Sequence, residues 1–148
     1  MKHVLGLDFG NVIKPIGQLG MMCGFELALP RLKRLFGTNI YIVSRVDDLT
    51  RGEKHVRNFM VEHNLYEYIP DGNLNFCILR SEKAGICDKL GITHFVDDRT
   101  EVLSHMKNVK CRYALNPTER QLADFPPTNM KVCLDWFDAM NKIEKDFV

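Results

Sequence analysis

The side chains of this sequence that could do chemistry stand at the ends of short apolar segments. They are Asp8, Ser44 and the adjacent pair Asp97 and Asp98. Lys83 joins them, because it begins the helix expected before the apolar segment that ends at Asp97. A charge is costly in the middle of a sheet, so we place the three carboxylates at strand ends. The carboxyl ends of parallel strands form the edge where ligands bind, which makes these residues site candidates.

The chemistry that this set could support is phosphoryl transfer. Three carboxylates at one sheet edge would repel one another without a cation, and an all-oxygen set suits Mg²⁺. In such a site Asp8 would attack phosphorus, while Mg²⁺ neutralises charge. The Ser44 hydroxyl and the Lys83 ammonium group would hold the phosphate oxygens.

The elements that must position these side chains alternate along the chain. Apolar runs predict strands, and amphipathic or capped segments predict the intervening helices; the strands are expected at residues 3–7, 39–43, 76–79, 93–96, 111–115 and 130–134, and the helices at 30–36, 49–63, 81–90, 100–106, from 118 and from 136. In the helices, Pro30 is expected at the first position, after a separate turn, Ser81 and Thr100 as caps, and Thr118 with Gln121 as a capping box. Gly37 and Gly91 each end a helix that runs directly into a strand. This alternation predicts an α/β fold with a mostly parallel sheet between helices.

The composition is ordinary for a compact soluble protein. Its 148 residues are 45% hydrophobic and carry a net charge of +1, which predicts a single domain over residues 1–148 and gives no reason to expect a nucleic-acid or membrane partner. No apolar run approaches the length of about 18 residues that a membrane span needs. The five cysteines form no CxxC pair, so we expect free thiols and a cytoplasmic location.

Four segments in order resemble the motifs of the haloacid dehalogenase-like (HAD) superfamily. They are residues 7–12 (LDFGNV), 42–44 (IVS), Lys83 and 94–98 (HFVDD). The resemblance implies a Rossmann-like three-layer fold and a Mg²⁺-dependent phosphatase that works through an aspartyl-phosphate on Asp8. It also implies that Asp8, the Gly10 carbonyl, Asp97 and Asp98 hold the metal. We assign Ser44, Lys83, and the neighbouring Arg45 and Asn11, to phosphate binding.

The sequence departs from the family pattern at Gly10. Most phosphatases of this family carry a second aspartate here, which protonates the leaving group and then activates water. General acid–base catalysis is commonly worth about 10²–10⁴-fold, so its absence predicts a slow enzyme or, as the alternative, a phosphate-binding or regulatory protein without turnover. Asn11, Lys14, Arg45 or the substrate itself could provide the missing proton path.

The spacing of the motifs leaves no room for a full cap domain. Between Asp8 and Ser44 lie 35 residues and between Ser44 and Lys83 lie 38, and both stretches already hold a helix. An open site would take a large phosphorylated substrate or be closed by a second subunit, so an oligomer is one option. Residues 14–24 form either a small flap or a plain loop. A nucleic-acid end bound by the basic residues between 45 and 57 is a third hypothesis, against which the near-neutral charge argues.

Each candidate also has a purely structural interpretation. Ser44 could be a turn cap, Asp8 could cap the following turn, and Lys83 could be a solvated helix residue. Lys89 is a rival for the lysine role, although a cation near a helix C-terminus is favourable for structural reasons alone. The basic face of the helix at 49–63 could simply be solvated.

Overall fold

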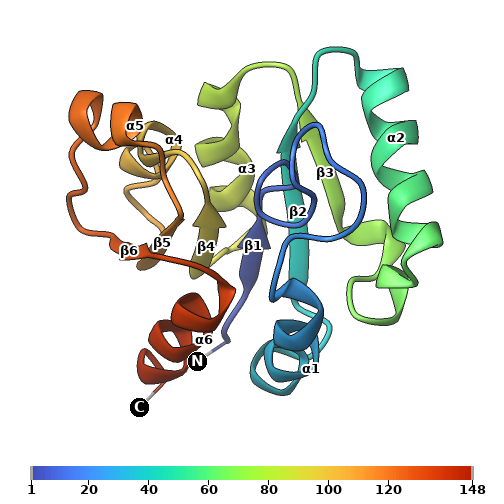
Figure 1. The fold of residues 1–148 in the computed structure, drawn as a ribbon, viewed down its shortest axis with the longest axis horizontal. Coiled ribbons are helices and arrows are strands. Elements are labelled where there is room, and N and C mark those ends of the chain that lie inside the picture. Colours follow the sequence, from blue (N-terminus) through green and yellow to red (C-terminus); the bar gives the residue numbers. More distant parts are fainter. Residues whose placement is uncertain (1, 148) are drawn as a thin grey trace.

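The structure is a computed structural model that describes residues 2–147, and it is built around one six-stranded parallel sheet (Figure 1). The strands lie in the order β3-β2-β1-β4-β5-β6. Their bounds are β1 Leu5–Leu7, β2 Ile40–Arg45, β3 Leu74–Cys77, β4 His94–Asp97, β5 Cys111–Leu115 and β6 Lys131–Cys133. The helices are α1 Phe25–Phe36, α2 Leu49–Glu62, α3 Lys83–Leu90, α4 Thr100–Ser104, α5 Glu119–Asp124 and α6 Trp136–Lys145, with short 3₁₀ turns at Leu65–Glu67, Asp71–Asn73 and Arg80–Glu82.

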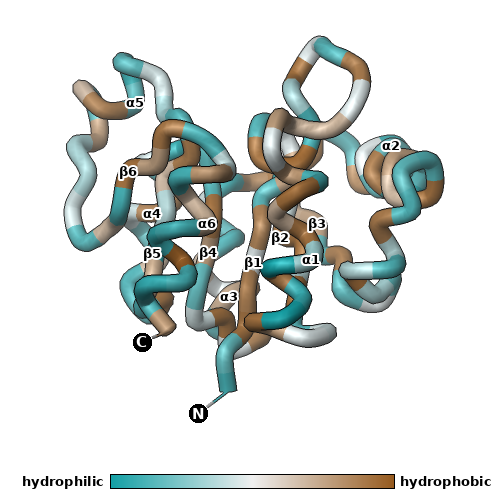
Figure 2. Tube along the Cα trace, turned by 60° about the horizontal axis from the view of Figure 1, so that its bottom comes forward, coloured by the Kyte–Doolittle hydropathy of each residue, from teal (hydrophilic) through white to brown (hydrophobic). Residues whose placement is uncertain are grey.

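Helices cover both faces of this sheet. One buried apolar cluster joins the sheet to α1, α2 and α6, and a second joins it to α3 and α4. Figure 2 shows the apolar strands in the middle and mixed hydropathy along the helices, as expected when each helix buries one face. The α/β three-layer fold predicted from the alternation is therefore confirmed.

Strand β1 lies inside the sheet, paired in parallel with β2 on one side and β4 on the other. Leu5 and Leu7 belong to the first cluster, whereas Gly6 faces the second. A β-carbon at Gly6 would lie 2.5 Å from the Phe95 ring, so only glycine lets that ring pack across β1. This central position brings the end of β1 between the ends of β2 and β4.

Helix α1 starts earlier than the sequence predicted. It runs from Phe25, so Pro30 lies inside the helix and no separate turn precedes it. The two residues Phe25 and Leu29, at 0% and 2% exposure, are packed in the core. Their burial, worth about 1.5–3 kcal/mol for each large side chain, offsets the backbone hydrogen bond that Pro30 cannot donate.

Two of the expected helix caps are wrong. Before α3 the Leu79 N–H donates to Glu82 Oε1 (2.8 Å), so Ser81 lies inside a 3₁₀ turn and α3 begins at Lys83. Thr100 is the first residue of α4, and its hydroxyl donates to the Gln121 carbonyl (2.9 Å). Glu82 thus takes the capping role expected of Ser81, whereas the Thr100 hydroxyl is bonded to a residue 21 positions away.

Other local predictions differ less. Thr118 does cap α5 by accepting from Gln121 N (3.1 Å). Strand β3 lies two residues earlier than expected, and Leu79 is 60% exposed. No helix among residues 2–147 is long and apolar enough to cross a membrane.

Candidate active site

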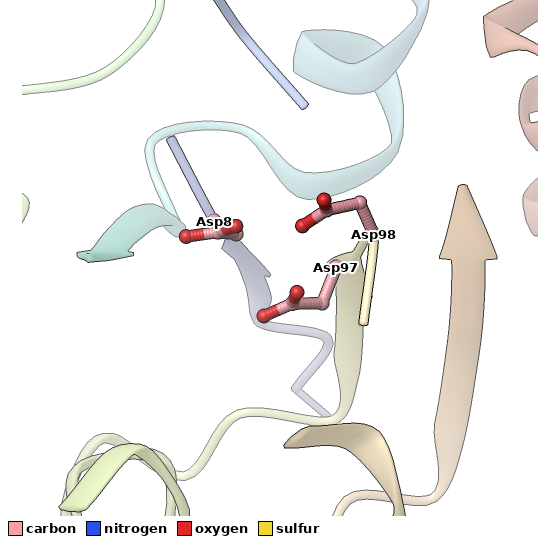
Figure 3. A group of neighbouring side chains, drawn as sticks. All are labelled: Asp8, Asp97 and Asp98. Carbon is pink, nitrogen blue, oxygen red and sulfur yellow. The ribbon is translucent and has the colours of Figure 1, made fainter. Parts of the chain in front are cut away.

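Three carboxylates meet at the carboxyl edge of the sheet (Figure 3). Asp8 follows β1, Asp97 ends β4 and Asp98 comes directly after it. One carboxylate oxygen from each lies within 4.8 Å of the others. The parallel pairing of β1 with β4 brings these side chains together although nearly 90 residues separate them in sequence. The clustering expected of the three aspartates is therefore present.

Lys83 joins two of these carboxylates. Its ammonium group donates to Asp8 Oδ1 (2.8 Å) and to Asp97 Oδ2 (3.0 Å). The 3₁₀ turn at Arg80–Glu82 leads into α3 and points Lys83 inward, where it is 3% exposed. The solvated interpretation of Lys83 is thus wrong, while Lys89 is exposed on the same helix.

The electrostatics of the cluster are those of a crowded acidic site. Burial, together with the charge of Asp97, raises the pKa of Asp8 to about 6, although Lys83 opposes the rise. Burial and the charges of Asp97 and Asp8 raise the pKa of Asp98 to about 8. For Lys83 burial acts downward, but the two carboxylates outweigh it and hold the pKa above its ordinary value. One ammonium group therefore does not balance three carboxylates, and the cluster favours an added cation.

Asn11 connects this cluster to the loop that follows β1. Its backbone is left-handed (φ 62°), a conformation that asparagine tolerates. Its side-chain amide donates to Asp98 Oδ2 (3.3 Å), and its carbonyl oxygen accepts from Ile16 N (3.0 Å). Both ends of the amide are engaged, so Asn11 positions Asp98 and the loop. Its expected contact with phosphate stays a prediction.

Ser44 and Arg45 lie at the end of β2, the neighbouring strand. Ser44 is 4% exposed, and its hydroxyl donates to the Arg45 carbonyl at a long 3.5 Å. The Arg45 guanidinium group pairs with Asp47 (2.5 Å). Neither residue is bonded to the three clustered carboxylates. The expected contacts of Ser44 and Arg45 with phosphate also stay predictions.

Gly10 lies at the mouth of the site. A single parallel bridge pairs it with Lys14. A β-carbon here would lie 3.3 Å from Ile16 Cδ1, so Ile16 covers the space that a longer side chain would enter. The Ile16 side chain is itself 70% exposed.

A cleft of about 870 Å³ lies at the ends of β1 and β2, and none of the three clustered carboxylates lines it. Its lining includes Gly10 and Ser44 and continues over the 14–17 segment and the first turns of α2. Helix α2 contributes Arg51 and His55, which the sequence had indicated only as part of a basic face. Arg51, Lys54 and His55 are exposed, as the solvated interpretation predicted, and nothing in the local pattern pointed to the cleft.

Solved structures that are similar to this chain include a natural enzyme and a designed protein. D,D-heptose 1,7-bisphosphate phosphatase from Burkholderia thailandensis is 15% identical, with a TM-score of 0.66 over 97% of this chain and 99% of that one. A de novo designed Rossmann-fold protein is 14% identical, with a TM-score of 0.49 over 95% of this chain and 92% of that one. No family model matches the sequence, and no curated protein matches it significantly.

The match to the heptose bisphosphate phosphatase spans nearly the whole of both chains. Together with the six-stranded parallel sheet and the helices on both of its faces, it defines the class of fold. The chain has a Rossmann-like three-layer α/β fold, which is the fold that the motif resemblance implied.

Proposed function

We propose that this protein is a Mg²⁺-dependent phosphatase that forms an aspartyl-phosphate on Asp8. The observation that carries the proposal is the cluster of Asp8, Asp97 and Asp98 at the sheet edge, with Lys83 bonded to two of them. A nucleophilic carboxylate, a fixed ammonium group and an all-oxygen metal site are the parts that phosphoryl transfer needs.

The donor set fits Mg²⁺. Asp8 and Asp98, with the Gly10 carbonyl and support from Asp97, would hold the ion. Burial first, and then the charges of the neighbouring carboxylates, raise the pKa values of Asp8 and Asp98, and a cation would offset both effects. When bound, Mg²⁺ would neutralise charge that builds up on the transferred phosphoryl group.

The residues of the chain divide the remaining work. A carboxylate oxygen of Asp8 attacks phosphorus, and the bond from phosphorus to the ester oxygen breaks. Lys83 keeps Asp8 in its charged form and, with the Ser44 hydroxyl, holds phosphate oxygens. Water then hydrolyses the aspartyl-phosphate and restores Asp8. Gly10 supplies no proton to the leaving alcohol. The leaving group is therefore expected to depart slowly from alkyl esters.

The test is a panel of phosphate monoesters assayed with and without Mg²⁺. Wild type should hydrolyse at least some of them only with Mg²⁺, and Asp8→Asn should abolish turnover, because an amide cannot form the acyl phosphate. Asp124→Asn is the matched control, since Asp124 is an exposed partner of Arg120 far from the motif residues in sequence. Equal hydrolysis by wild type and Asp8→Asn would reject the proposal.

A second candidate is a phosphate-binding or regulatory protein that does not turn over. Gly10 favours it, because Ile16 lies where an acid–base side chain would extend. In that case wild type would bind phosphate in a Mg²⁺-dependent manner but hydrolyse none of the panel.

A further inference from the structure

The cleft at the ends of β1 and β2 has the dimensions of a small-molecule site. Its volume of about 870 Å³ falls in the range of about 300–1,000 Å³ that is usual for ligand pockets. Gly10 and Ser44, which belong to the proposed site, are among its lining residues. A phosphate held at the proposed site would therefore place the rest of its ester beside two residues of the cleft.

The lining of the cleft includes apolar side chains from three elements. Phe9, Val46 and Val56 line it, with exposures of 5%, 9% and 2%, so each is anchored in the protein and presents only a small apolar surface. Ile16 adds an exposed side chain from the loop. Such a surface suits a ligand with an apolar body.

Most charges at the rim of the cleft already have partners. Arg45 pairs with Asp47 (2.5 Å), and Asp48 caps α2 by accepting from the Arg51 backbone (2.9 Å). The Lys14 ammonium group donates to two loop carbonyls, those of Pro15 and Gln18. The Arg51 guanidinium group is the most weakly paired of these cations. It is 90% exposed, and its closest approach to Asp48 is a long 3.9 Å.

Helix α2 holds Arg51 toward the cleft. His55 lies one turn after Arg51 and also lines the cleft, so the two share a helix face, whereas Lys54 does not line it. The start of α2 packs tightly on the end of β2, because a β-carbon at Gly52 would lie 2.4 Å from Val46 Cβ. This close packing fixes the position of the α2 backbone at Arg51, whose side chain extends into solvent.

We propose that this cleft holds the alcohol part of a phosphate monoester and that Arg51 selects alcohols with an apolar body and a second negative charge. The inference rests on the proposed function, since it takes the phosphate to lie at Asp8. It adds the class of substrate, for which Arg51 is a specificity residue.

The experiment compares three aryl phosphates that differ in one distant charge. Phenyl phosphate is neutral at the para position, 4-(carboxymethyl)phenyl phosphate is anionic there, and 4-(2-aminoethyl)phenyl phosphate is cationic. Their phenol leaving groups have similar acidity, so differences in kcat/KM report binding of the para group. Wild type should prefer the anionic ester over the neutral one by about three- to fivefold, the size expected of an exposed ion pair, and should disfavour the cationic one.

Two variants separate Arg51 from the general charge of the helix. Arg51→Gln should reduce the preference to below about twofold, whereas Lys54→Gln removes an equal charge from α2 and should leave it unchanged. An equal loss in both variants would mean a long-range field and would overturn the role of Arg51. No preference in wild type would overturn the substrate class.

A binding measurement keeps this inference distinct from the proposed function. The corresponding benzylphosphonates cannot be hydrolysed, and their affinities can be measured by calorimetry with Mg²⁺ present. An anionic preference that depends on Arg51, without hydrolysis of any ester, would support the cleft and reject the phosphatase. Hydrolysis that depends on Asp8, with no preference in either measurement, would support the phosphatase and reject the cleft.

Discussion

Lys83 Nζ lies 2.8 Å from Asp8 Oδ1, and both side chains are almost inaccessible to solvent. The same ammonium group lies 3.0 Å from Asp97, whose side chain is fully buried. Removing one member of such a buried group leaves uncompensated charge, which is far more costly than losing an exposed ion pair.

Lys83→Met should therefore lower the free energy of unfolding by about 3–5 kcal/mol without Mg²⁺. Mg²⁺ should recover part of this loss, because it would supply positive charge to the same carboxylates. Urea unfolding with and without Mg²⁺ measures both effects. Lys89→Met, at an exposed position of the same helix, is the control, and a loss as small as that of the control would show that the ion pairs contribute little.

Mg²⁺ should raise the melting temperature of wild type more than that of Asp98→Asn. The substitution removes one of the three carboxylates that lie within 4.8 Å of one another. The effect of Mg²⁺ should also be larger near about pH 8.5 than near about pH 6.5, because Asp98, with a pKa of about 8, must lose its proton to bind the ion. Equal shifts in wild type and Asp98→Asn would show that the metal site is not here.

Gly10→Asp should raise turnover of alkyl phosphates more than that of aryl phosphates, by up to about 10²-fold. An alkyl leaving group needs a proton, whereas a phenolate departs more readily without one. Since Ile16 lies over this position, Gly10→Asp is best measured beside Gly10→Asp with Ile16→Ala, and Ile16→Ala alone is the control. Fast hydrolysis of alkyl phosphates by wild type would mean that another residue already transfers the proton.

His94 should make the protein less stable in acid. Burial, with the nearby His3, lowers its pKa to about 4, and no hydrogen-bond partner is present for Nε2. In the unfolded chain His94 takes up a proton at about pH 6.5, whereas in the folded protein it does so only at about pH 4. The free energy of unfolding therefore falls as the pH decreases through this window, by up to about 3 kcal/mol.

His94→Phe should not show this loss of stability in acid, and it should keep the aromatic packing with Phe36 and Phe147. Denaturant unfolding from about pH 7 to about pH 4 gives the difference between variant and wild type. His105→Gln, at an exposed position, should follow wild type. A constant difference between His94→Phe and wild type across this range would show that His94 does not titrate as described.

The sequence by itself determined the order of the elements and the residues of the acidic cluster. Apolar runs that end in Asp8 and Asp97 are local patterns, and helices that end at Gly37 and Gly91 before a strand imply parallel pairing. Parallel pairing alone is enough to place the ends of such strands at one edge. Short-range information therefore placed the aspartates at one edge of the sheet, and the pairing of β1 with β4 made them neighbours.

Only the tertiary structure decided the features that depend on distant partners. The start of α1 follows from the burial of Phe25, and the Thr100 hydroxyl is bonded to Gln121 rather than capping its own helix. The cleft likewise depends on distant segments, since Gly52 lets α2 pack closely on Val46 and the lining joins Arg51 of α2 to Gly10 after β1. Packing between segments far apart in the chain determined these features. The spacing of residues within one segment does not predict such contacts.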